Sequence, residues 1–272
     1  MKKLRKVMSF LLAATLLLVN SNSVLAANNQ KANDETWEAR RAYIEENMIK
    51  LGSQGFDNVD EWLQLNGVEK VKLKASSKDK DDVISPMSDP GNISIYSIDG
   101  YFDSLAKKYL VKGWWSWNST SYVDSTTGAL EGVALSMSNT DFSPATGYVL
   151  ASNPAGIAVY DQAGNYYSNT GATSKIDSSG VSYIYQDAWL GTQYRGYKGQ
   201  AWFWMTTPPT TSSSNPIYLK MHYIHTWTGA NLETFGLKWQ PGAPPELNMT
   251  FSTVPAQWPA TNQITIYNWP YN

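Results

Sequence analysis

The sequence contains two histidines, His222 and His225, whose side chains suit proton transfer near neutral pH. Both lie in residues 217–227, where the alternation of residue types predicts a strand. Residues three apart on a strand point to opposite faces, so this pair does not chelate one metal ion. His225 shares its face with Leu219 and Met221 and is a candidate catalytic base. A hydrogen-bonded interior histidine is the simpler interpretation.

Paired carboxylates are the second route to catalysis, because glycoside hydrolysis needs two of them across a cleft, about 5 Å or more apart. The aromatic part of the chain, residues 92–272, holds three glutamates. Two of them, Glu131 and Glu233, lie in apolar, strand-like runs where burial would tune an acid. Outward-facing positions on a solvated strand are the simpler interpretation, and the sequence does not bring the two together.

Other catalytic and metal-binding motifs are missing from the sequence. The chain has no cysteine, which excludes a thiol nucleophile, a thiolate metal site and disulfides. It has no Gly-x-Ser-x-Gly elbow, His-Glu-x-x-His motif, phosphate loop or dinucleotide fingerprint. Residues 161–165 offer oxygen atoms to a structural calcium ion, but they lack the acidic spacing of a calcium loop, and a hairpin turn explains them better. We therefore predict no cofactor and no metal.

Aromatic residues are the remaining candidates for a site. Ten of the twelve tryptophans and sixteen of the seventeen tyrosines follow residue 90. Exposed aromatic rings stack on the C–H faces of sugars, and exposed tryptophan is unusual enough to suggest a binding surface. The predicted ligand-binding residues are Trp114, Trp189, Tyr194, Tyr197, Trp202 and Trp204. The alternative is that these rings fill a core.

The N-terminus predicts export. Four basic residues precede an apolar run from Val7 to Val19, and Val24-Leu25-Ala26 has the small residues of a signal-peptidase site. We expect residues 1–26 to be a signal peptide, the mature protein to be secreted by a bacterium, and no membrane anchor to remain. Removing the four positive charges takes the formal charge from −2 to −6. This acidity argues against nucleic acid as a partner.

The residues between the signal and the aromatic part are rich in charge. Residues 27–74 are predicted to be a helical segment, with amphipathic helices over Asp34–Leu51 and Asn58–Asn66. Residues 75–91 are predicted to be a solvated linker. The helical segment is either a pro-region or cap that covers the rest of the protein, a partner-binding element, or a pair of helices packed by Trp37 and Trp62.

Residues 92–272 are predicted to form a mainly β domain. Apolar and polar residues alternate in several runs, and one hairpin is clear, with strands at 156–160 and 166–168. No helix-length amphipathic pattern follows Lys108. We predict an antiparallel β-sandwich, jelly-roll-like or Greek-key, preceded by the small helical segment.

Three functions are compatible with these features. The first is a secreted, non-catalytic protein that binds a polysaccharide, another cell-surface polymer or another secreted protein through exposed aromatics. The second is a secreted glycan hydrolase with a carboxylate pair. The third is a pore-forming, toxin-like protein, because Tyr166–Tyr185 is a polar Ser/Thr-rich stretch of the kind that inserts as a hairpin. We favour the first.

Overall fold

The computed structural model describes residues 36–71, 75–76, 92–119, 130–139, 141, 143, 155–167, 173–177, 179–206, 208, 211, 215–226, 231–240, 243–252, 257–266 and 269. The chain divides into two compact units, Met1–Glu46 and Asn47–Asn272. In the first unit the described residues, 36–46, are helical. The helix continues to residue 52 in the second unit, which confirms the helix predicted over Asp34–Leu51.

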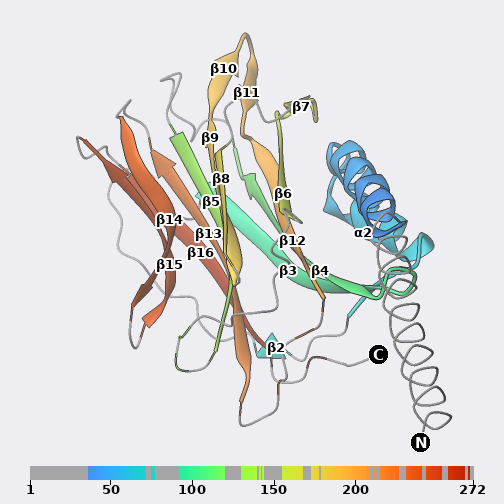
Figure 1. Ribbon diagram of the computed structural model, residues 1–272. Coiled ribbons are helices and arrows are strands. Elements are labelled where there is room, and N and C mark those ends of the chain that lie inside the picture. Colours follow the sequence, from blue (N-terminus) through green and yellow to red (C-terminus); the bar gives the residue numbers. More distant parts are fainter. Residues whose placement is uncertain are drawn as a thin grey trace, which may run out of the picture. The chain divides into compact units, whose positions relative to one another are not determined.

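Two six-stranded antiparallel sheets make up most of the second unit, which confirms the prediction of a mainly β sandwich-like fold (Figure 1). The first sheet has the strand order β1 (Val68–Lys70), β3 (Ile93–Asp103), β4 (Lys108–Trp117), β12 (Lys198–Met205), β6 (Ala155–Tyr160), β7 (Tyr166–Tyr167). The second has the order β2 (Ala75–Ser76), β16 (Gln257–Ile266), β13 (Ile217–Thr226), β5 (Leu130–Asn139), β9 (Gly180–Gln186), β8 (Thr173–Asp177). β6 and β7 form the predicted hairpin.

Two further hairpins complete the strands. β10 (Ala188–Leu190) pairs with β11 (Gln193–Arg195), and β14 (Leu232–Gln240) pairs with β15 (Ala243–Phe251). The second hairpin covers the outer face of the second sheet, where Ile184 and Ile224 pack with Phe235 and Met249. This layer explains why β5 and β13 are buried on both faces, although their sequences alternate only in part.

The main core lies between the two sheets. Trp115 and Trp117 of β4 and Phe203 of β12 pack there with Tyr223 of β13 and Val133 of β5. The ring centroids of Trp115 and Tyr223 are 6.1 Å apart, and those of Trp117 and Tyr223 are 6.3 Å apart. Large aromatic side chains therefore fill the interior of a protein that has no disulfide to stabilise it.

Helical residues cover the outer face of the first sheet. The Gln200 amide donates to the Met48 carbonyl (2.8 Å), and the Tyr160 hydroxyl donates to the Ile49 carbonyl (2.7 Å). Helix α2 (Phe56–Leu65), which begins two residues before the predicted second helix, places Phe56 against Trp114 with ring centroids 6.2 Å apart. β4 and β12 are consequently buried on both faces.

An ion pair fixes α2 on the sheet. Asp60 of α2 accepts a 2.6 Å hydrogen bond from the Lys112 ammonium and another of 2.6 Å from the Tyr101 hydroxyl. The Lys112 side chain is only 3% exposed. Lys70 joins the pair at the surface, 3.1 Å from Asp60 and 3.0 Å from Asp99. Asp60 is thus the counter-charge that a lysine buried in a sheet requires.

Two short strands lie where the sequence analysis predicted a helical segment and a linker. β1 lies in the predicted helical segment and pairs with β3, and β2 lies at the start of the predicted linker and pairs with β16. The pro-region role of residues 27–74 stays a prediction, as does the removal of residues 1–26, which lie outside the described residues. No helix among the described residues is long and apolar enough to cross a membrane.

Gly52 lies at a close approach between the helix end and the first sheet. A Cβ atom there would be 2.2 Å from the Tyr160 hydroxyl oxygen and 2.6 Å from the Gln200 amide nitrogen. An exposed glycine in a helix gains about 1 kcal/mol on replacement by alanine. We expect Gly52→Ala to lose about 1–3 kcal/mol of unfolding free energy instead, because the methyl group separates the helix from the sheet.

Urea denaturation of the four proteins of a Gly52→Ala and Tyr160→Phe cycle checks this expectation. Removing the hydroxyl relieves the closest contact, so the glycine substitution is expected to cost less in the Tyr160→Phe background. Equal costs in both backgrounds, or a stabilising Gly52→Ala, would contradict the close packing.

Candidate functional site

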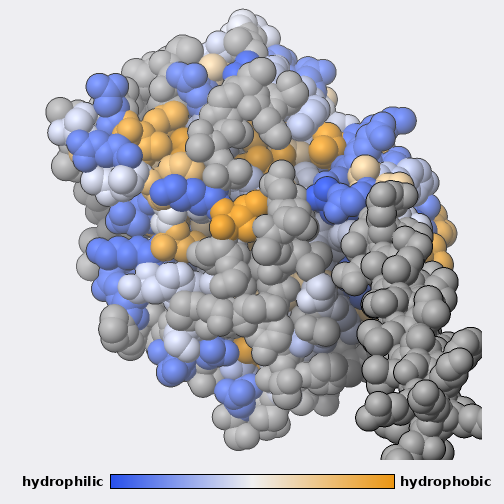
Figure 2. Space-filling model, in the orientation of Figure 1, coloured by the Kyte–Doolittle hydropathy of each residue, from blue (hydrophilic) through white to orange (hydrophobic). Residues whose placement is uncertain are grey.

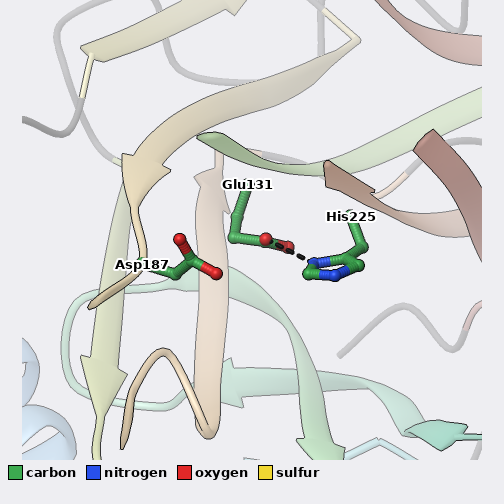
Figure 3. Close-up of side chains that lie close together, drawn as sticks. All are labelled: Glu131, Asp187 and His225. Atoms are coloured by element: carbon green, nitrogen blue, oxygen red, sulfur yellow. Dashed lines mark hydrogen bonds and ion pairs between the residues drawn. The ribbon is translucent and has the colours of Figure 1, made fainter. Parts of the chain in front are cut away.

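Glu131, Asp187 and His225 converge in the interior of the sandwich (Figure 3). Glu131 lies on β5, Asp187 directly follows β9, and His225 lies near the end of β13. β5 is hydrogen-bonded to both β9 and β13, so the strand register brings the three together. Three potential ligand atoms, one from each residue, lie within 4.8 Å of one another. We call these three residues the buried triad.

Burial is the main property of the triad. Glu131 is 0% exposed, and Asp187 and His225 are each 2% exposed. The Nδ1 atom of His225 lies 2.6 Å from the Oε1 atom of Glu131, and the Trp117 ring meets the imidazole edge-on with centroids 5.0 Å apart. Oε2, the other oxygen of Glu131, has no hydrogen-bond partner. The triad therefore keeps a carboxylate oxygen available for a further ligand.

Tyrosine hydroxyls surround the triad. The hydroxyl of Tyr194 donates a short hydrogen bond to the Asp187 carboxylate. The hydroxyls of Tyr185 and Tyr223 lie 3.2 Å apart. Burial, reinforced by the charge of Glu131, raises the pKa values of all three tyrosines well above their ordinary value. These phenols thus stay protonated and serve as hydrogen-bond donors rather than as bases.

The chemistry open to the triad follows from its donors and its burial. One imidazole and two carboxylates can share a proton or hold a metal ion. They can also act as an acid and a base, but only if a substrate reaches them. Among the described residues, all three side chains are buried, which favours proton sharing or metal binding over acid–base catalysis on a substrate.

The predicted catalytic residues separate in the structure. Glu131 faces the core between the sheets, whereas Glu233 is exposed on β14, beyond the outer face of the second sheet. They do not form a pair, so this form of the hydrolase hypothesis is not supported. His225 faces the buried interior as expected, and His222 is buried on the opposite face of β13. Asp187 was not among the sequence candidates.

The predicted ligand-binding aromatics are mostly interior. Trp114, Tyr194, Trp202 and Trp204 are buried, whereas Trp189 and Tyr197 are partly exposed. The expectation of exposure fails for the first four because helical residues cover one face of β4 and β12, and Trp189 packs on Tyr194 with centroids 5.5 Å apart. Stacking of a sugar on these four rings would need the covering residues to move.

The turn considered for calcium is held by hydrogen bonds. The Asp161 carboxylate accepts from the Asn165 backbone N–H (2.8 Å), the Asn165 amide (2.8 Å) and the Tyr167 hydroxyl (2.9 Å). These contacts account for the acidic residue as part of the β6–β7 turn.

Aromatic rings reach the surface at the ends of a row that crosses the first sheet. The row is Tyr96, Phe56, Trp114, Tyr160 and Tyr166, with successive ring centroids 5.7, 6.2, 6.2 and 5.9 Å apart. Tyr96 is 44% exposed and Tyr166 is 36% exposed, whereas Trp114 and Tyr160 are buried and Phe56 is partly exposed. Tyr197 is partly exposed and packs against the core between the sheets, and burial raises its pKa above the ordinary value.

We call Phe56 and Tyr96 the tyrosine surface. Polar groups adjoin it: the Asn262 amide donates to the Tyr96 carbonyl (2.7 Å), and the Ser94 hydroxyl donates to Asn118 (2.7 Å). On the face that Figure 2 draws, hydrophobic residues form small patches between hydrophilic ones. A separate shallow hollow, lined by Lys175, Phe235 and Leu237 among others, lies away from both the triad and the tyrosine surface.

Comparisons with known proteins give little guidance. No protein-family model matches the chain, and no curated protein matches it. Among solved structures the chain is similar to one from work on "pH-induced modulation of Streptococcus parasanguinis adhesion by Fap1 fimbriae", at 13% identity and a TM-score of 0.26. The match covers 64% of this chain and 81% of that chain. A likeness this weak leaves the function to be argued from the residues.

Proposed function

We propose that this chain is a secreted, non-catalytic binding protein that recognises a glycan of the cell exterior through the tyrosine surface. The observation that carries the proposal is the stacked pair of Phe56 and Tyr96, 5.7 Å apart, with Tyr96 44% exposed. An exposed ring backed by a second ring is a rigid platform for the apolar face of a sugar. The buried Trp114 ring packs against Phe56, with centroids 6.2 Å apart, and so holds the stacked pair in place.

The neighbours of the platform suit the hydroxyl groups of a sugar. Asn118 and Ser94 lie at the ends of β4 and β3, where the Ser94 hydroxyl can still accept a hydrogen bond after donating to Asn118. Asn262 donates its amide hydrogens to the Ile95 and Tyr96 carbonyls and offers its side-chain oxygen as an acceptor. Amides and hydroxyls both donate and accept hydrogen bonds, as sugar hydroxyls require. The acidic net charge of the chain favours an uncharged glycan over an anionic polymer.

The non-catalytic part of the proposal is supported by the position of the carboxylates. Among the described residues, the carboxylates of Glu131 and Asp187 lie close together in the triad, but both are buried. The tyrosine surface itself has aromatic, amide and hydroxyl groups, which bind rather than cleave. Export is supported by the N-terminal sequence pattern alone.

Titration calorimetry against a panel of uncharged wall and plant polysaccharides tests the proposal. We expect one or more members to bind, and the affinity to fall about tenfold or more in Tyr96→Ala, because losing one stacked ring removes about 1.4 kcal/mol or more. Tyr166→Ala is the matched control, since Tyr166 is also an exposed tyrosine but lies at the other end of the row. Its affinity should be unchanged.

Three outcomes would contradict the proposal. Absence of binding to every member of the panel would reject glycan recognition, and equal losses in the two variants would reject the tyrosine surface as its place. Release of reducing sugars, abolished by Glu131→Gln, would show the hydrolase instead. Leakage of lipid vesicles would support the pore former, although β9 holds residues 180–185 of the suspected hairpin within the second sheet.

A further inference from the structure

We propose that Glu131, Asp187 and His225 bind one divalent transition-metal ion, Zn²⁺, in the interior of the sandwich. The three residues offer two carboxylate oxygens and one imidazole nitrogen, which are zinc ligands in proteins. They come from β5, from the residue after β9 and from β13, so the ion would join three neighbouring strands of the second sheet. The site is independent of the tyrosine surface.

The spacing of the side chains fits an ion of this size. Ligand atoms at the usual 2.0–2.2 Å from zinc are about 3.4 Å apart in a tetrahedral site. In the triad the Nδ1 atom of His225 lies 2.6 Å from the Oε1 atom of Glu131, and three ligand atoms, one from each residue, lie within 4.8 Å of one another. Small side-chain rotations, without movement of the strands, therefore bring the three atoms to coordination distance. Figure 3 shows the Glu131 carboxylate between Asp187 and His225.

The charge of the triad favours a cation. Two carboxylates buried to 0% and 2% exposure lose most of their hydration, which is costly unless positive charge compensates them. Among the described residues, the ion-pair partner of Glu131 is His225 alone. A protonated imidazole carries one positive charge against the two negative charges of the triad, whereas a divalent ion with a neutral imidazole carries two. The buried Oε2 of Glu131, which has no hydrogen-bond partner, is a further ligand atom.

The surroundings resemble those that orient metal ligands. Carboxylate ligands are commonly held by a second layer of hydrogen bonds. The Tyr194 hydroxyl donates such a bond to Asp187. The Trp117 ring packs edge-on against the imidazole of His225 and restricts its rotation. Both contacts hold the ligands in place before an ion arrives.

The donor set selects zinc over calcium and magnesium. Calcium takes 6–8 oxygen ligands and magnesium prefers oxygen in a regular octahedron, and imidazole suits neither ion. Zinc accepts three protein ligands in a four-coordinate site and tolerates a mixture of nitrogen and oxygen. The chain has no cysteine, so a zinc ion would supply a cross-link that disulfides do not.

Metal content and stability test the inference. The purified protein is unfolded in guanidinium with a chelator, dialysed, and refolded with ZnCl₂ or without added metal. We expect one zinc per folded chain by mass spectrometry of the element, a higher Tm than for the protein refolded without metal, and no matching rise with CaCl₂. Refolding is used because the triad is buried and an ion enters most easily before the sheets close.

Two histidine variants separate a metal role from simple packing. His225 and His222 are both buried on β13, but on opposite faces. His225→Gln is expected to lose the bound zinc and the zinc-dependent rise in Tm, whereas His222→Gln keeps both. Tyr194→Phe is expected to retain the fold and to weaken zinc binding about 10–100-fold, because it removes a hydrogen bond to a ligand.

The contrary results are equally specific. A wild-type protein that refolds without zinc uptake, or whose zinc is retained in His225→Gln, would overturn the proposal even if a variant failed to fold. In that case Glu131 and His225 are an interior pair that shares a proton, and Asp187 lies beside them. Binding of Ca²⁺ in preference to Zn²⁺ would also overturn it. Glycan binding is measured separately, so either proposal can fail alone.

Discussion

Replacing Asp60 with alanine is expected to lower the free energy of unfolding by about 3–5 kcal/mol, because the substitution leaves a buried lysine without its counter-charge. The ammonium of Lys112, on a side chain 3% exposed, lies 2.6 Å from the Asp60 carboxylate. The buried Tyr101 hydroxyl loses its acceptor as well. Guanidinium denaturation of the wild type and the variant, followed by tryptophan fluorescence, measures the loss.

Asp99→Asn is the control for this substitution. Asp99 lies opposite Lys112 on the neighbouring strand and acts on it through its charge, but its ion pair is with Lys70, whose side chain is 37% exposed. We therefore expect a cost of at most about 1 kcal/mol. Similar costs for the two variants would show that burial of Lys112 does not govern the docking of α2.

Acid should reduce the effect of Asp60→Ala. Burial acts to raise the pKa of Asp60, but the charge and hydrogen bond of Lys112 outweigh burial and hold that pKa below its ordinary value of 3.8. A lowered carboxylate pKa stabilises the fold above the ordinary value, and this stabilisation is lost as the pH falls through the lowered pKa. The difference between wild type and variant is therefore expected to shrink below about pH 4.

Trp202→Ala is expected to cost about 3–5 kcal/mol of unfolding free energy, because Trp202 is 2% exposed and its truncation opens a cavity. The indole lies against Gly156, where a Cβ atom would meet it at 2.1 Å. Chemical denaturation gives the loss, and glycan titration of the folded fraction gives the affinity. We expect a large loss of stability and an unchanged affinity.

Trp189→Ala is the matched control, since Trp189 is a partly exposed member of the predicted aromatic set. Its cost should be clearly smaller than that of Trp202→Ala. If Trp202→Ala kept full stability and abolished glycan binding, Trp202 would be a ligand contact. That result would contradict its assignment to the core.

The sandwich was predictable because alternation within a strand is a local property. The runs around β5, β13 and β16 each carry it, and the β6–β7 hairpin shows it across a turn. Alternation did not reveal that both faces of β4 and β12 are covered. That covering comes from residues 47–65, which contact strands far along the chain, for example Met48 with Gln200. Trp114, Trp202 and Trp204 were therefore expected at the surface and lie inside.

The triad was predictable only in part. Strand periodicity placed His225 on the buried face, and an apolar run marked Glu131 as a desolvated carboxylate. Their meeting depends on the register of β5 with β13, which pairs Gly132 with Ile224. Asp187 lies one residue beyond the end of β9, where alternation gives no signal. Glu233 carried the same sequence signal as Glu131 but lies on the outer hairpin.

Hydrogen exchange with and without bound glycan tests the central claim, recognition of a sugar by the tyrosine surface, most directly. The measurement uses the member of the panel that binds most tightly. We predict slower amide exchange at residues 93–98 and at Phe56. Amides of β14 and β15, on the far side of the second sheet, should not change. Protection confined to β14 and β15, or none anywhere at saturating glycan, would contradict the claim.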